Sequence, residues 1–211
     1  MPKKLLKCKF ANSLGPVNVA APFQLFGATP LTDSCFFIDS AEWLNIPITN
    51  INLTIKWDNI PPNFTHYYKD YSFSSPCTNS SFKVNIYVLY QGNWQVLNAR
   101  PLNLFQQTNG MIKTTAVFNL KVSSQFFRMT DNEVVATQPF QNPGTLMIKL
   151  VQPTEGFGSA LYGQAVSTAA LLNANAASTQ VSNLNPATLL KPMPNHPYSP
   201  LVKQLDISIG Y

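Results

Sequence analysis

Apolar and polar residues alternate with a period of two in several segments of the chain, and this pattern restricts the possible fold more than any other feature. The most regular examples are residues 50–57 and residues 204–211. Successive side chains of a β-strand point to opposite faces of the sheet, so the alternation predicts strands with one buried face. The same interpretation applies to residues 82–90, 94–97, 116–122 and 146–150.

These strands are separated by turn residues, which favour direct antiparallel connections. Gln91, Gly92 and Asn93 are typical of a hairpin between residues 82–90 and 94–97, and this hairpin is expected to be central. The sequence therefore predicts a mainly β fold, an antiparallel β-sandwich of about seven or eight strands with one late α-helix.

The predicted helix covers about residues 158–174. Gly156 and Gly158 give a flexible start, and Ser159 is a candidate N-cap. Apolar residues then recur at near-helical spacing, and the small ones among them would let the helix approach a sheet closely. The stripe consists of Leu161, Ala165, Ala169 and Leu172.

A proline-rich segment follows the helix and precedes the last predicted strand. Its prolines exclude a regular helix or a central strand and favour an extended, preordered path. They stand at positions 186, 192, 194, 197 and 200.

The composition favours one globular module over residues 1–211. We expect a first strand in residues 1–11, a sandwich body in residues 12–150, and the helix, proline-rich segment and closing strand in residues 151–211. Hydrophobic residues make up 45% of the chain but charged residues only 11%, so neutral hydrogen-bonding groups carry the polar surface. Such a surface suits permanent protein contacts.

Charge and cysteine usage argue against several functions. The net charge is +5, but the lysines and arginines are scattered, apart from a cluster in residues 3–9 that the solvent face of a first strand explains, so nucleic-acid binding is not predicted. Cys8, Cys35 and Cys77 have no metal-binding spacing and do not indicate a disulfide framework. The longest unbroken apolar run is far too short for a membrane-spanning segment.

The sequence contains no recognisable catalytic or cofactor-binding motif, so we predict neither an enzymatic activity nor a cofactor. His66 and His196 stand at neither a ligand spacing nor a triad spacing. Glu155 is predicted to cap the start of the helix, where the helix dipole favours an anion.

Several motifs together resemble one protein family. The most specific match places an aromatic pattern of that family in register on Trp57, Ile60, Pro61, Phe64, Tyr67, Tyr68 and Tyr71. Further matches are residues 22–27, 37–42, 155–162 and 194–200. From about residue 12 to residue 211, the chain resembles a module of the baseplate wedge proteins of phage-tail-like contractile injection systems.

The resemblance implies a structural component of a phage-tail-like baseplate, which holds neighbouring subunits by protein–protein contacts. The expected partners are other baseplate subunits in a hetero-oligomer, assembled in the cytoplasm into a virion or injection-system particle. Wedge subunits are usually much longer, so the chain is either a stand-alone version or one piece of such a protein. The alternative is a carbohydrate- or receptor-binding β-sandwich, such as a fibre or adhesin module, because clustered tyrosines also form sugar-binding platforms and protein hot spots.

Two surfaces are candidates for protein contacts. One is the aromatic run in residues 64–71, expected to point partly inward, and the other is the proline-rich segment, where stiffness would lower the ordering cost of docking. The open alternative is that the prolines pack on the protein's own sheet and bring the last strand into place. The candidate contact residues are Phe64, Tyr67, Tyr68, Tyr71, Asn195 and Tyr198.

Overall fold

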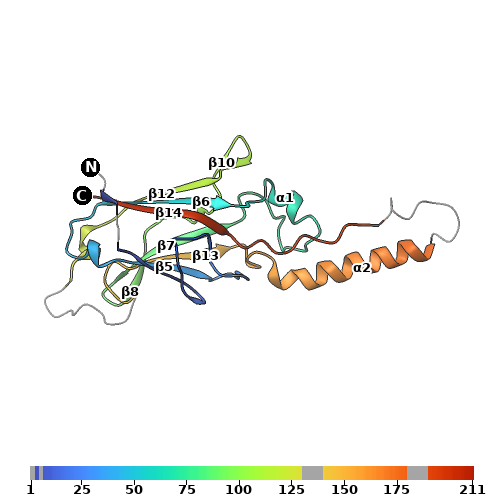
Figure 1. Ribbon diagram of the computed structural model, residues 1–211, viewed down its shortest axis with the longest axis horizontal. Helices are drawn as coiled ribbons and strands as arrows, with labels where there is room; N and C mark the ends of the chain where they lie inside the picture. The colour runs from blue at the N-terminus through green and yellow to red at the C-terminus, as the bar shows by residue number, and fades with distance from the viewer. Residues whose placement is uncertain (1–2, 5–6, 130–139, 180–189) are drawn as a thin grey trace.

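Two antiparallel sheets form the body of the protein. A computed structural model describes residues 3–4, 7–129, 140–179 and 190–211. Within these residues, the first sheet has five strands in the order β1 (Lys3–Lys4), β14 (Leu201–Gly210), β6 (Asn50–Asp58) and β12 (Thr115–Lys121), with β4 (Phe23–Gln24) also paired to β14. Figure 1 shows this sheet lying over the second one.

The second sheet has seven strands among the described residues. Its order is β3 (Gly15–Pro16), β2 (Lys9–Asn12), β5 (Cys35–Asp39), β13 (Leu146–Gln152), β7 (Lys83–Tyr90) and β8 (Asn93–Val96), with β9 (Leu102–Asn103) also paired to β7. A separate small hairpin consists of β10 (Gln107–Thr108) and β11 (Met111–Ile112). The mainly β, antiparallel, sandwich-like fold with a late helix is thus confirmed.

The core lies between the sheets and follows the predicted alternation. Ile51, Leu53 and Ile55 of β6 are fully buried, as are Val84, Ile86 and Val88 of β7 and Ile148 and Leu150 of β13. In β14 the register to β6 shifts between Val202 and Gln204. Ile207 and Ile209 are buried as expected, whereas Tyr211 follows the end of the strand and is exposed.

Two details of the body differ from the sequence interpretation. The first strand expected in residues 1–11 is two short strands, of which β1 joins the five-stranded sheet and β2 the seven-stranded sheet. The hairpin of β7 and β8 is not central as a unit, because β7 pairs with β13 on one side while β8 is the edge strand. Exposed side chains along β8 agree with its place at the edge.

The late helix is longer than predicted and starts differently. A short 3₁₀ turn, Ser159–Leu161, leads into α2 (Tyr162–Thr179). Gly158, with φ 79°, holds the cap position. Glycine suits this place because other residues adopt such a left-handed conformation only with strain. Among the described residues, the buried hydroxyl of Ser159 has no hydrogen-bond partner, so the N-cap prediction was wrong.

Helix α2 does not lie along a sheet. Figure 1 shows it extending away from the sandwich, with the chain that precedes β14 running beside it. Ala165 and Ala169 of the predicted stripe are buried, but Leu171 and Leu172 are exposed. We call Ser159–Leu161, α2 and residues 190–197 together the arm.

We predict that the body, not the arm, determines the stability of the isolated chain. Replacing the fully buried Leu53 by Ala should lower the free energy of unfolding by about 2–5 kcal/mol, because the change removes apolar contacts and leaves a cavity between the sheets. The matched variant Leu171→Ala, at a side chain that is 66% exposed, should change it by less than about 0.5 kcal/mol. Urea denaturation measures both, and equal losses would contradict the prediction.

Candidate functional site

An aromatic cluster joins the arm to the body, and it contains most of the candidate contact residues. It begins at the short helix α1 (Phe64–Tyr67), which the sequence analysis did not predict. The side chain of Asn63 caps α1 by accepting a hydrogen bond from the backbone N–H of His66 at 3.0 Å. The side-chain oxygen of Asn79 accepts from the N–H of Phe64 at 2.8 Å.

Four of the six candidate contact residues are buried within the chain itself. Phe64, Tyr68, Tyr71 and Tyr198 are at most 8% exposed, Tyr67 is half-buried and Asn195 is exposed. The ring of Phe64 lies 5.6 Å from that of Tyr198 and 6.0 Å from that of Tyr68. The structure thus brings the aromatic run and the proline-rich segment together, and contact with another protein stays a prediction for these residues.

Tyrosine hydroxyls hold the proline-rich segment against the aromatic run. Tyr67 donates to the carbonyl of His196 at 2.8 Å, and Tyr71 donates to the carbonyl of Asn195. In return, the side-chain amide of Asn195 donates to the carbonyl of Tyr67 at 2.9 Å. Prolines leave few backbone N–H groups in this segment, so its path is held mainly through carbonyl acceptors.

Tyr68 occupies the centre of this network. Its hydroxyl donates to the carbonyl of Phe157 at 2.9 Å and accepts from the backbone N–H of Tyr198 at 3.0 Å. Burial raises the pKa of Tyr68 and that of Tyr198 well above the ordinary value. Both hydroxyls therefore stay protonated at neutral pH, as a donor must.

Within the arm, Asn173 pairs α2 with the proline-rich segment. The side-chain oxygen of Asn173 accepts from the backbone N–H of Lys191 at 2.8 Å, and its nitrogen donates to the carbonyl of Lys191 at 3.0 Å. Nearer the body, the rings of Tyr162 and His196 lie 4.8 Å apart. Sequence analysis missed Asn173, because one asparagine in an asparagine-rich segment carries no distinguishing signal.

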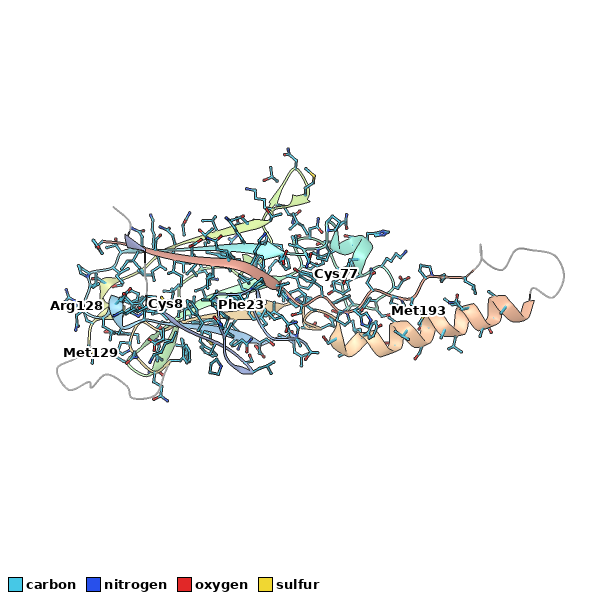
Figure 2. The ribbon with its side chains drawn as sticks, viewed as in Figure 1. Cys8, Phe23, Cys77, Arg128, Met129 and Met193 are labelled. Carbon is cyan, nitrogen blue, oxygen red and sulfur yellow. The ribbon has the colours of Figure 1, made fainter. Side chains whose placement is uncertain are left out.

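Large apolar side chains remain exposed on the arm. Leu171 and Leu172 belong to α2, and Leu190 and Met193 belong to the segment beside it. Figure 2 shows Met193 on the extended segment, well away from the sandwich. Helix α2 contains no Asp, Glu, Lys or Arg. The arm thus presents exposed apolar side chains on a surface that is nearly uncharged.

Glu155 anchors the loop before the arm. It does not cap the helix, and the prediction that it would do so was wrong. Its carboxylate accepts from the backbone N–H of Ser74 at 2.8 Å and from the hydroxyl of Thr154 at 3.0 Å. Hydrogen bonding by Ser74 is the main cause that lowers the pKa of Glu155 to about 2. At Gly156 a side chain would clash, because an added Cβ would lie 2.7 Å from the carbonyl oxygen of Pro30.

The chemistry of the described residues is limited. No three of their His, Cys, Asp and Glu side chains gather closely enough to hold a metal ion. Burial raises the pKa of Cys8 to about 11 and that of Cys77 to about 12, which keeps these thiols protonated at neutral pH. Figure 2 shows the two cysteines far apart in the molecule, and both are free thiols.

No helix in the described part of the chain combines the length and the apolar character that a membrane crossing requires.

We predict that the Tyr68 hydroxyl stabilises the junction of body and arm. Tyr68→Phe leaves the buried N–H of Tyr198 without its acceptor, and this should cost about 1–3 kcal/mol in the free energy of unfolding. Tyr211→Phe, at an exposed tyrosine, is the matched control and should change it by less than about 0.5 kcal/mol. A Tyr68→Phe variant as stable as the wild type would contradict this role.

We also predict that Glu155 makes stability depend on acid pH. Its pKa is lower in the folded protein than the ordinary 4.5, so the ionised carboxylate stabilises the fold above pH 4.5 and this contribution is lost as the pH falls toward 2. The melting temperature of the wild type should exceed that of Glu155→Gln above this window, and the gap should close within it. A gap that stays constant through the window would show that the charge is irrelevant.

Comparison with known proteins identifies the family. A family model described as "Baseplate protein PVC11-like" matches residues 8–186, which is most of the chain and includes the aromatic run. No curated protein matches the chain. The match confirms the resemblance to baseplate proteins of phage-tail-like systems that the sequence motifs indicated. The chain therefore belongs to the PVC11-like family of baseplate proteins.

Proposed function

We propose that this chain is a non-enzymatic structural subunit of a contractile injection-system or phage-tail-like baseplate and that it holds neighbouring subunits through its arm. It acts as one module over residues 1–211. Its partners are other baseplate subunits in a hetero-oligomer, and assembly takes place in the cytoplasm. Family membership supports the baseplate role.

This proposal rests on the apolar side chains of the arm that are exposed to water in the isolated chain. Four large apolar side chains of the arm are exposed, and α2 carries no charge that would favour contact with water. A helix of 18 residues with only a few buried side chains gains little from its own packing. Exposed apolar patches of this kind are typical of protein–protein contact sites.

The aromatic cluster supports the same proposal as a foundation for the arm. Hydrogen bonds from Tyr67, Tyr68 and Tyr71 hold the proline-rich segment in place before any partner binds. Binding of a partner therefore loses little conformational entropy in this segment. In this proposal Asn195 and Tyr67 lie at the rim of the contact. The buried members Phe64, Tyr68, Tyr71 and Tyr198 act by holding the segment in place.

The alternative of glycan binding has less support from this geometry. A sugar-binding platform needs an aromatic face open to solvent. In the aromatic run, the rings of Phe64, Tyr68 and Tyr71 are buried by the chain itself. The aromatic residues that suggested a platform are therefore occupied in the fold.

We predict that the double variant Leu171→Gln, Leu172→Gln folds normally and fails to assemble. Glutamine is a good helix former, so the helix is retained while the apolar surface is lost. Truncated hot-spot side chains often cost about 2 kcal/mol or more in binding, so incorporation into particles should fall by at least roughly tenfold. Quantitative mass spectrometry of purified particles measures incorporation, and melting temperature checks the fold.

The matched control is Val96→Gln, which removes an exposed apolar side chain from the edge strand β8 of the body. It should enter particles at the wild-type level. Wild-type incorporation of the arm variant, or an equal loss in the control, would contradict the role of the arm. Tyr198→Ala is not suited to this test, because Tyr198 is buried and its truncation also removes core packing.

A further inference from the structure

The five-stranded sheet ends at β12, whose outer edge is a potential pairing site. On its inner side β12 pairs with β6 along its whole length. The carbonyl of Thr114 accepts from the N–H of Trp57 at 2.8 Å, so residues at even positions direct their backbone groups toward β6. In an antiparallel ladder the direction of the backbone groups alternates along the strand. The N–H and C=O groups of Thr115, Val117 and Asn119 therefore point away from β6. Outward backbone groups at the edge of a sheet are a template for an added strand when nothing else pairs with them.

One side chain occupies the middle of this edge. The amide nitrogen of Gln106 donates to the carbonyl of Val117 at 2.6 Å, and its amide oxygen accepts from the N–H of Val117 at 3.2 Å. An amide side chain carries the same donor and acceptor as a peptide unit. Gln106 thus makes the two hydrogen bonds that a residue of a neighbouring strand would make.

The β10–β11 hairpin holds Gln106 in this place. The N–H of Lys113 donates to the carbonyl of Gln106 at 2.7 Å and closes the base of the hairpin. At its tip, Asn109 and Gly110 have positive φ angles of 52° and 77°, which are typical of a tight hairpin turn. Figure 1 shows this hairpin standing above the end of β12. The turn therefore returns the chain so that Gln106 lies beside the strand that follows it.

We propose that Gln106 acts as an edge lock, which prevents a second copy of this chain from pairing its own β12 with this edge. Charge alone does not prevent that pairing. Lys121 is the one charged residue of β12, and an antiparallel pair centred on Phe118 places Thr115 opposite Lys121 and Val117 opposite Asn119. No like charges face each other in this arrangement, so charge repulsion would not prevent the pairing. In our proposal, the hydrogen bonds of Gln106 to Val117 prevent it. This role is independent of the arm.

The test removes the lock and measures self-association by sedimentation velocity over a range of concentrations. Gln106→Ala should form a larger species that grows with concentration and that the wild type does not form. Gln107→Ala, the same change one position along, is the matched control and should behave as the wild type. If Gln106→Ala sediments as the wild type does, the proposal is wrong.

A second variant tests whether the association uses the β12 edge. Adding Val117→Pro to Gln106→Ala removes the outward N–H at the centre of the edge, and proline is tolerated at an edge strand. This double variant should return to the wild-type sedimentation pattern. Persistent association would show that another surface is responsible and would overturn the proposal.

Hydrogen exchange in the wild type provides a test that requires no variant. After correction for the intrinsic exchange rate of each residue, the amide of Val117 should be protected at least roughly fivefold more strongly than that of Asn119, which points the same way without the Gln106 contact. Equal protection of the two amides would show that the Gln106 hydrogen bonds do not persist in solution and would overturn the proposal.

Discussion

The structure depends on a cluster of aromatic rings that lies where the sandwich meets the arm. Phe82 and Phe157 stack with their centroids 4.2 Å apart, and Phe64 lies 4.8 Å from Phe82 and 5.0 Å from Phe105. Tyr198 completes the cluster. These residues come from five parts of the chain, so their burial joins the α1 region, the residue before strand β7, the loop between β9 and β10, the loop before α2 and the segment before β14. Large rings supply much apolar area at each such point, which suits a junction between segments without a shared sheet.

Neutral amide side chains perform many of the tasks that charged residues perform elsewhere. Asn63 caps α1, Asn173 pairs α2 with the neighbouring segment, and Gln106 covers the edge of β12. An amide offers a donor and an acceptor on one group, so it can replace a peptide unit of a missing strand or turn. A carboxylate or an ammonium group offers only one of the two. In a chain with few charged residues, neutral Asn and Gln side chains thus make these hydrogen bonds to backbone groups.

Family and geometry lead to the same kind of function. The chain belongs to a baseplate family, and its least self-sufficient element is an uncharged helix that extends from a well-packed body. The body and the arm are stabilised by different interactions. The body buries its apolar residues between two sheets, whereas the arm is held by hydroxyl and amide contacts and leaves leucines exposed. Such a division is consistent with the proposed role, in which the arm contacts neighbouring subunits.

The strands of the sandwich were predictable from the sequence, because the alternation of apolar and polar residues is a local property of each segment. Residues 50–57, 82–90 and 204–211 could thus be recognised as strands, and the prolines near position 195 predicted an extended path. The order of the strands, the split of the first strand between two sheets and the direction of α2 were decided by tertiary structure. So were the partners of Tyr68, Glu155 and Gln106, because these contacts join residues far apart in sequence or depend on how a hairpin returns the chain. A local pattern records which face of a segment is buried, but only packing decides what buries it.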